Sequence, residues 1–238
     1  MSNRAHRETD RILAELEEDI ALLFAVGLDE LNFATLYIEG DYTQRQRLQN
    51  ARRERNDLTD FIIALIVAGV INSASEINQK AREIYAVNYR SIAKKEGSGE
   101  LQPRRLDEQR LQIDVAASVK KRMDNAVRRG YLPADIQGEI KKELRKWKNI
   151  AIRMARMQTT RIENVARLDA LYELRRNGAN VKKQWKAIID KVTRQSHKRV
   201  DGEVRELEER FSNNLLYPGD PDAPPEEVQN CRCYLVVA

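Results

Sequence analysis

The chain has 238 residues, of which 42% are hydrophobic and 33% are charged, with only ten Gly and six Pro. This composition favours long helices over β-sandwiches and β-barrels, and the length allows one large domain or two small ones. The formal net charge of +5 is unevenly spread, because residues 1–60 hold 8 Lys and Arg against 13 Asp and Glu, whereas residues 101–160 hold 15 against 7. A net charge of −5 followed by one of +8 favours contact of the middle segment with a polyanion or an acidic protein surface. Charges of this kind also occur on helix faces that meet only solvent.

The N-terminal third is predicted to be helical. The chain starts without the apolar run of a signal peptide, so we expect a soluble protein. Apolar side chains spaced three to four residues apart predict a first helix over residues 8–36, with Thr9 or Asp10 as its N-cap. Two further helices are predicted over residues 44–72 and 73–95.

One continuous apolar run lies in this region. It covers Phe61–Ile71, whereas crossing a bilayer takes about 20 apolar residues. We therefore predict no membrane span. The run is interpreted either as a helix buried on all sides or as an interface with a partner.

The clearest linker follows, in the Gly- and Pro-containing segment from Glu96 to Pro103. Beyond it a charged helix is predicted over residues 105–129. Another starts with Pro133 in its first turn and runs to about Arg176, where Asn177-Gly178 stops it. The predicted division has an N-terminal helical region, a linker, a basic helical region and a C-terminal module, over residues 1–96, 97–104, 105–178 and 179–238.

The last long helix combines basic and apolar side chains. Trp147 lies among five candidates for nucleic-acid binding: Lys141, Lys142, Arg145, Lys146 and Lys148. Cations can meet phosphates while an aromatic ring stacks on a base. Trp147 also shares an apolar stripe with Ile150 and Met154, so a core Trp with lysines facing solvent is the preferred interpretation. The stripe turns polar at Gln158 and Arg161, whose side chains either reach a partner or extend to the surface.

After Gly178 the helical period ends. Short β-capable segments at Val181–Asp190 and Cys231–Val237 are separated by turn residues. They predict a compact α+β module whose last strand is Tyr234–Val237. The predicted fold class is therefore mainly α, a long helical N-terminal body with a small C-terminal α+β module.

His197, Cys231 and Cys233 form a set of soft metal ligands. Zinc sites use four N or S ligands, or three plus water. Alternate residues of an extended chain point to opposite faces, so the two cysteines share a metal only if the backbone bends. Two cysteines so spaced make no disulfide framework, which indicates a reducing compartment. We predict no metal and no other cofactor, with buried packing of the three residues as the preferred interpretation and a metal site as the alternative.

Asp190, Arg194, His197 and Asp201 could form an acid–base cluster, because His titrates near neutrality and carboxylates orient it. The module has no Ser or Cys nucleophile at a diagnostic spacing, and the chain has no Gly-rich phosphate loop. We predict that the protein is not an enzyme. The alternative is a small metal- or His-dependent nuclease-like module that uses His197 with Asp190 and Arg194.

Short motifs follow one another through this module in a fixed order. They are Lys183-Gln184-Trp185, Ile188-Ile189-Asp190, Arg194-Gln195-Ser196-His197, Val200-Asp201-Gly202, Phe211-Ser212-Asn213, Tyr217-Pro218-Gly219-Asp220-Pro221, Pro225-Glu226-Glu227 and Asn230-Cys231-Arg232-Cys233. The ordered set closely resembles the bacteriophage head-morphogenesis family, the minor head proteins similar to the F protein of phage Mu. The resemblance covers about residues 150–238 and begins with Ala155-Arg156 and Thr160-Arg161-Ile162-Glu163-Asn164, which look like the family's Ala-Arg-Thr-Glu segment.

The residues that match the family motif are expected to be structural. They are Trp185, Asp190, Arg194, His197, Asp201, Gly202, Pro218, Gly219, Asp220, Asn230, Cys231 and Cys233. The chain departs from the family at Met157-Gln158, where the family has Thr-Glu. It departs again at Arg194 and His197, where some members carry a Cys-x-x-Cys, so a four-ligand metal site of that kind is incomplete here.

The resemblance implies a minor capsid protein of the virion, associated with the portal vertex inside the head and present in the host cytoplasm during assembly. It implies contacts with the portal protein and other capsid components, and with double-stranded DNA during packaging or ejection. The acidic residues 1–60 would then dock on protein and residues 101–160 would face DNA. Longer family members carry a toxin or enzyme domain after the Asn-Cys-Arg-Cys end, and we expect none here.

Overall fold

The computed structural model describes the backbone of residues 2–35, 44–94, 106–129 and 133–238. Side chains are described for residues 4–25, 63–94, 106–126, 128–129 and 138–238. The predicted break at 37–43 and the predicted linker at 97–104 lie outside these ranges.

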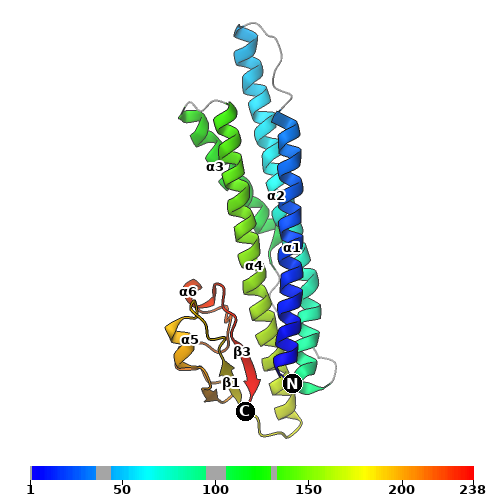
Figure 1. Cartoon of the computed structure of the whole chain (residues 1–238), viewed down its shortest axis with the longest axis vertical. Helices are drawn as coiled ribbons and strands as arrows, with labels where there is room; N and C mark the ends of the chain where they lie inside the picture. Colours follow the sequence, from blue (N-terminus) through cyan, green and yellow to red (C-terminus); the bar gives the residue numbers. More distant parts are fainter. Residues whose placement is uncertain (1, 36–43, 95–105, 130–132) are drawn as a thin grey trace. The chain divides into compact units, whose positions relative to one another are not determined.

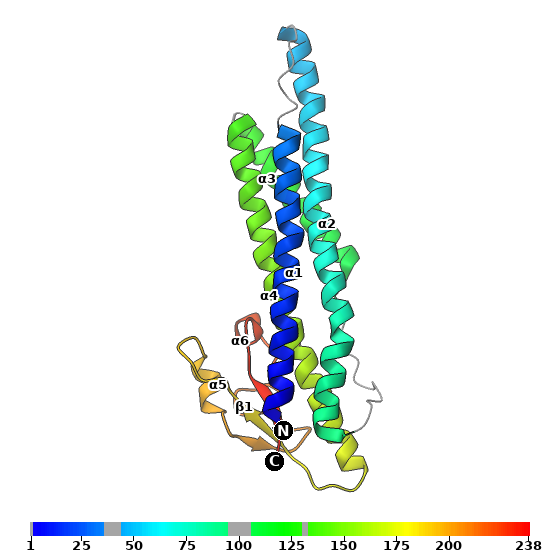
Figure 2. The same ribbon diagram turned by 45° about the vertical axis from the view of Figure 1, so that its right-hand side comes forward.

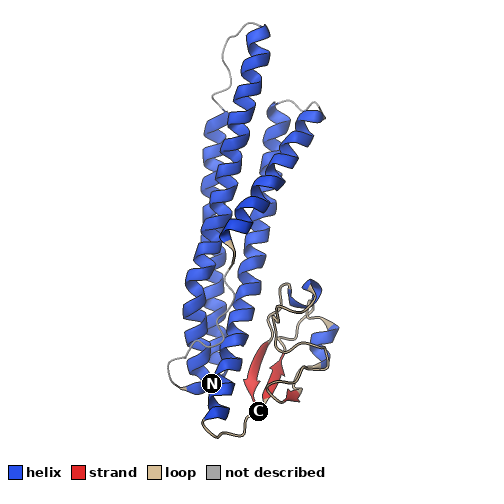
Figure 3. Ribbon diagram, turned by 180° about the vertical axis from the view of Figure 1, so that it is seen from behind, coloured by secondary structure: helices blue, strands red, loops and turns tan. Residues whose placement is uncertain are grey.

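Four long helices make up most of the described chain, and Figure 3 shows them in blue. They are α1 (Ser2–Thr35), α2 (Gln44–Ala93), α3 (Glu108–Arg128) and α4 (Pro133–Arg176). The mainly α prediction is therefore confirmed. None of the described helices combines the length and the apolar character that crossing a membrane requires.

Two helix predictions were wrong. Residues 44–72 and 73–95 do not form separate helices but the single helix α2. Ser73 lies inside this helix, where its hydroxyl donates to the Gly69 carbonyl (2.7 Å). Thr9 and Asp10 do not cap α1, which begins at Ser2. Thr9 lies inside the helix and its hydroxyl donates to the Ala5 carbonyl (3.0 Å).

Helix α4 ends where the sequence predicts. Gly178 has a φ of +86°, its N–H donates to the Arg175 carbonyl (2.9 Å), and the Ala179 N–H donates to the Leu174 carbonyl (3.0 Å). A left-handed Gly at this position satisfies carbonyls that the helix end would leave without donors.

The C-terminal module holds a three-stranded antiparallel sheet in the order β2-β1-β3 (Figures 1 and 3). Its elements are β1 (Lys183–Lys186), α5 (Gln195–Arg199), β2 (Val204–Arg205), α6 (Pro225–Val228) and β3 (Tyr234–Val237). Trp185 of β1 pairs with Leu235 of β3. The predicted last strand is confirmed, whereas β1 is shorter than the predicted segment Val181–Asp190, and residues 231–233 precede β3 without being part of it.

The chain divides into two compact units. Unit 1 comprises Met1–Glu17, Glu76–Arg105 and Arg153–Ala238, and unit 2 comprises Glu18–Ser75 and Leu106–Ile152. Helices α1, α2 and α4 thus contribute to both units. The predicted boundaries at 96, 104 and 178 stay a prediction.

Each unit has its own buried set. In unit 1 the core gathers residues of the sheet, of α4 and of the end of α2, including Trp185, Leu235, Leu171 and Tyr89. In unit 2 buried apolar residues come from all four helices: Phe24, Ile66, Val70, Val115, Val119, Met123, Ile140, Leu144 and Trp147. The preferred interpretation of Trp147 as a core residue is confirmed.

The apolar run Phe61–Ile71 has only one buried face in its described part. Ile66 and Val70 are buried, whereas Ala64 and Ala68 are exposed. The interpretation of this run as a helix buried on all sides is therefore wrong. The alternative of a partner interface stays a prediction.

Candidate functional site

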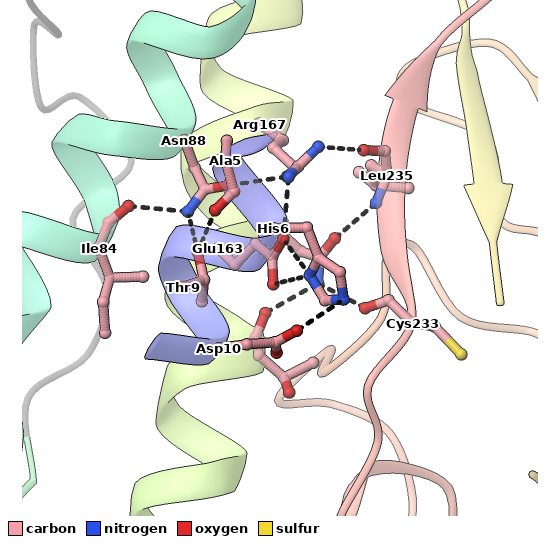
Figure 4. A network of polar contacts seen from close by, with 12 residues as sticks. Ala5, His6, Thr9, Asp10, Ile84, Asn88, Glu163, Arg167, Cys233 and Leu235 are labelled. Atoms are coloured by element: carbon pink, nitrogen blue, oxygen red, sulfur yellow. Dashed lines mark hydrogen bonds and ion pairs between the residues drawn. The ribbon is translucent and has the colours of Figure 1, made fainter. Parts of the chain in front are cut away.

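Helix α4 holds the free edge of strand β3 with side chains (Figure 4). The Asn164 amide accepts from the Leu235 N–H (2.7 Å) and donates to the Cys233 carbonyl (3.1 Å). Thr160 donates to the Cys231 carbonyl (2.6 Å) and Arg167 to the Leu235 carbonyl (3.0 Å). Residues 160, 164 and 167 share one face of a helix, and alternate residues of an extended chain present their backbone groups on one side. The helix therefore satisfies an edge that would otherwise be open to another strand.

Arg167 lies at the centre of a buried polar network and is fully buried. It donates to Glu163 (2.9 Å) and to the Asn88 side-chain carbonyl (3.0 Å), as Figure 4 shows. Asn88 in turn donates to Thr9 (2.8 Å), and His6 contacts Glu163 (2.9 Å). These contacts join the beginning of α1, the last part of α2, α4 and β3 within unit 1.

His6 is the residue through which α1 reaches the module. Its ring stacks on Tyr234 of β3, with centroids 4.2 Å apart, and the two elements lie side by side in Figures 1 and 2. Burial disfavours the imidazolium, but the hydrogen bond and charge of Glu163 outweigh it and raise the pKa of His6 above its usual value. The network therefore favours the protonated form of His6.

The Pro-Gly-Asp-Pro turn packs tightly on α4. Gly219 has a φ of +83°, and a Cβ at this position would lie 3.1 Å from the backbone nitrogen of Arg161 and 3.2 Å from the Cα of Arg161. Arg161 also reaches the Gly219 carbonyl (3.4 Å), so this polar residue of the predicted stripe has a partner within the chain. Asp220 is buried and accepts from Arg210 (3.0 Å) and from the Leu216 N–H (2.9 Å).

Lys183 is a buried residue to which the sequence interpretation gave no role. Its ammonium donates to the Leu207 carbonyl (2.8 Å) and the Leu216 carbonyl (2.9 Å), and it lies 5.2 Å from the centre of the Phe211 ring. Burial lowers the pKa of Lys183 to about 8. Strand alternation puts Lys183 on the same face as the buried Trp185, and this was the signal that could have identified it.

His197, Cys231 and Cys233 are brought together in the module, and all three are buried. The Nδ1 atom of His197 lies 3.4 Å from the Cys233 sulfur and 3.6 Å from the Cys231 sulfur. Both cysteines are free thiols. They converge because residues 231–233 are outside β3 and follow Asn230, whose φ is +55°. The bend that a shared site requires is therefore present.

The two thiols ionise differently. Hydrogen bonding from Cys231, and then from His197, lowers the pKa of Cys233 to about 5. Hydrogen bonding to Cys233 and burial raise the pKa of Cys231 well above its usual value. The Cys233 thiol is therefore the more acidic of the two.

The predicted acid–base residues are held by other partners. Asp190 pairs with Arg232 and accepts from Thr193 (2.7 Å), and the hydrogen bond from Arg232 lowers the pKa of Asp190 to about 2. Asp201 accepts from the Ala187 N–H (2.8 Å). Arg194 donates to the Gln229 carbonyl. The carboxylate at His197 is instead Glu227, 3.0 Å from Nε2, to which the sequence interpretation gave no role.

Glu143 pairs with one member of the predicted basic cluster on α4, Lys146. This buried carboxylate contacts Lys146 (2.8 Å), Ser118 (2.9 Å), Trp147 (2.9 Å) and Arg122. Burial disfavours its charged form, but the hydrogen bonds from Lys146 and Ser118 outweigh it and lower the pKa of Glu143.

The remaining members of the cluster differ in whether they make an ion pair. Lys142 pairs with Glu139 (2.6 Å). Lys141, Arg145 and Lys148 make no ion pair with any residue in the part of the chain that the structure describes. Among the described residues, two of the five predicted cations therefore have a carboxylate partner and three do not.

A groove of about 390 Å³ lies between α3 and α4 in unit 2. Its lining includes four basic residues and two acidic ones: Lys121, Arg122, Arg129, Lys146, Glu139 and Glu143. Lys121 and Arg129 are exposed. The groove is therefore bordered by an excess of positive charge.

A family model and one curated relative point to one class of protein, the phage head-morphogenesis proteins. A family model described as "Phage Mu protein F like protein" matches residues 117–236, half of the chain, and the chain belongs to this family. The match begins before residue 150, so it includes part of the helical region upstream of the motifs.

Two curated relatives are similar to parts of the chain. The minor head protein GP7 of Bacillus phage SPP1 is 28% identical over 120 residues, which cover 47% of this chain and 38% of that protein. The NAD(+)–arginine ADP-ribosyltransferase EFV of Enterococcus faecalis is 30% identical over 123 residues, which cover 50% of this chain and 25% of that protein. The chain thus spans well under half the length of either relative. No solved structure matches the chain significantly.

Proposed function

We propose that this phage head protein acts at the portal vertex inside the head, where it assists head assembly and genome packaging or ejection by contacting the portal protein and DNA. Membership of the phage Mu F-like family carries the proposal, together with the similarity to a minor head protein of Bacillus phage SPP1. The virion is its final location and the host cytoplasm its place of assembly.

DNA contact is supported by the basic side chains of α3 and α4. Lys141, Arg145 and Lys148 have no carboxylate partner among the described residues, so they can meet phosphates without first breaking an ion pair. Lys142 and Lys146 would have to leave Glu139 and Glu143. Binding of this kind is electrostatic, largely independent of sequence and weakened by salt.

The proposed DNA contact is tested by the salt dependence of binding to a random-sequence duplex, followed by fluorescence anisotropy. A Lys141→Gln/Arg145→Gln/Lys148→Gln variant should bind more weakly. The negative slope of log K against log salt should become shallower by about 3, since each lost phosphate contact removes about 0.9 from its magnitude. The matched control, Lys142→Gln/Lys146→Gln, should change the slope less. Equal binding by all three proteins would refute this DNA-binding surface.

The acidic start of the chain is the proposed docking segment for the portal. Part of its charge is already paired within unit 1, since Glu17 binds Arg156 (2.6 Å). Co-purification of the protein with the portal protein of the same phage tests the partner. A complex that forms equally well when exposed acids of α1, such as Glu18 and Asp19, are changed to Gln and Asn would argue against docking through this segment.

We also propose that the protein acts without catalysis. Asp190, Arg194 and Asp201 each have a partner other than His197, so the residues on which the nuclease-like alternative relied are not assembled around that imidazole. The ADP-ribosyltransferase name belongs to a relative of which the chain spans one quarter. Metal-supplemented nuclease assays on the protein and on His197→Ala test the point, and cleavage that His197→Ala abolishes would overturn it.

A further inference from the structure

The three buried side chains His197, Cys231 and Cys233 present their ligand atoms to one another. The Nδ1 atom and the two sulfurs all lie within 4.8 Å of one another. Their exposed fractions are 1%, 3% and 3%. Such a closed cluster of one imidazole and two thiols is either a hydrogen-bonded packing arrangement or a metal site.

The spacing fits a tetrahedral ion. Zinc lies about 2.3 Å from a thiolate and about 2.0–2.1 Å from an imidazole nitrogen, so tetrahedral angles put nitrogen and sulfur about 3.5 Å apart. The observed distances from Nδ1 are 3.4 Å to Cys233 and 3.6 Å to Cys231. A metal could enter with little movement of the three side chains.

The imidazole is oriented as a ligand. Its Nε2 lies 3.0 Å from the Glu227 carboxylate, which the Ser196 hydroxyl also contacts (2.9 Å). An ionised carboxylate can only accept, so Nε2 carries a hydrogen, and loss of any proton on Nδ1 would leave a lone pair there that faces the sulfurs. A metal-bound His usually donates its other nitrogen to a carboxylate in this way.

The surroundings fix this arrangement. Trp185 meets the His197 ring edge-on, with centroids 5.2 Å apart. Helix α4 holds the carbonyls of both cysteines through Thr160 and Asn164. The ligands are therefore set in place by the module itself, without depending on the metal to gather them.

We propose that His197, Cys231 and Cys233 bind one zinc ion, with water as the fourth ligand. Two thiolates balance the charge of a divalent ion, which suits a buried position, and soft thiolates disfavour magnesium and calcium. Arg194 has no lone pair to offer as a fourth ligand. The site would stabilise the end of the module by tying α5 to the segment before β3, and it does not depend on the proposed contacts with portal or DNA.

The test is the metal content of the full-length protein, measured by mass spectrometry after purification without a metal-affinity step. We expect about one zinc per chain, and cobalt exchanged into the site should give intense sulfur-to-cobalt charge-transfer absorption. His197→Gln should lose both, whereas His6→Gln, a change of the other buried His of the chain, should keep both. A wild-type protein without zinc that gives no such absorption with cobalt would overturn the proposal, and so would a His197→Gln protein that keeps its metal.

A second pair of variants covers the case in which His197→Gln fails to fold. Glu227→Ala leaves all three ligands in place but removes the partner of Nε2, so zinc affinity measured by chelator competition should fall about 10–100-fold. Glu226→Ala alters an exposed carboxylate beside it and should leave the affinity unchanged. Equal affinities in the two folded variants would count against the proposed role of His197 as a ligand.

Discussion

Units 1 and 2 are built partly from the same helices, yet their interiors differ in chemical kind. Among the side chains that the structure describes, thirteen buried polar or charged residues lie in unit 1 and only Ser73 and Glu143 lie in unit 2. Unit 1 joins distant segments by directed hydrogen bonds, whereas unit 2 packs apolar stripes. A directed contact is satisfied by few residue types, but an apolar stripe accepts many.

This difference explains why the recognisable motifs lie in unit 1. Thr160 and Asn164 hold carbonyls of the Asn-Cys-Arg-Cys segment, and Gly219 allows the turn to approach Arg161. Each of these positions tolerates little change for a reason that can be stated. The helices of unit 2 need only the right period and volume.

Replacing Arg167 by Met is the strongest test of the polar interior. Met fills similar space but leaves the Asn88 and Leu235 oxygens without this donor and Glu163 without its buried guanidinium. Removing one partner of a buried pair costs about 3–5 kcal/mol. Urea unfolding, followed by Trp185 fluorescence in a Trp147→Phe background, measures the loss in unit 1.

The matched control is Arg175→Met, on the same helix. Arg175 pairs with Glu208 near the surface, 2.9 Å away, so its loss should cost about 1 kcal/mol or less. A similar cost for both variants would show that the network is no more demanding than a surface ion pair.

Gly219→Ala should have the next largest effect. The left-handed backbone alone costs a non-glycine residue about 1–2 kcal/mol, and the Cβ would in addition press on the Arg161 backbone. We expect about 2–3 kcal/mol in total. Gly202→Ala is the control, because Gly202 has a φ of +81° but nothing within 4 Å of its Cβ position. Equal losses would mean that the turn does not press on α4.

His6→Gln should give a smaller, pH-dependent effect. The folded-state pKa of His6 is raised, so its contribution is fully present below the unfolded pKa of about 6.5 and is lost as pH rises through the folded value. We expect the variant to be about 1 kcal/mol less stable near pH 6 and the gap to narrow at alkaline pH. A gap that stays constant from about pH 5 to pH 9 would show that the charge of His6 contributes nothing.

The sequence predicts the parts of this molecule that follow from local pattern. Apolar spacing predicts which regions are helical but not that α2 is continuous, Asn177-Gly178 predicts the end of α4, and β-capable residues predict the last strand. The polar network could not be predicted, because His6 and Glu163 are 157 positions apart and nothing near either residue indicates the other. The same holds for Glu227 at His197: an acidic residue in a Pro-Glu-Glu turn looks like any exposed acid. The convergence of the two cysteines also depends on a bend that alternation alone does not show.

Leu144→Met tests the other side of the comparison and should have the smallest effect. Leu144 is 2% exposed and lies among the apolar residues of unit 2, where a flexible side chain of similar volume can repack at a cost of about 1 kcal/mol or less. Trp147 fluorescence in a Trp185→Phe background reports on this unit. The introduced residue is the same as in Arg167→Met, so the two costs differ only in what is removed. A loss as large as that of Arg167→Met would mean that the apolar interior is as exacting as the polar one, and the uneven distribution of the motifs would then need another cause.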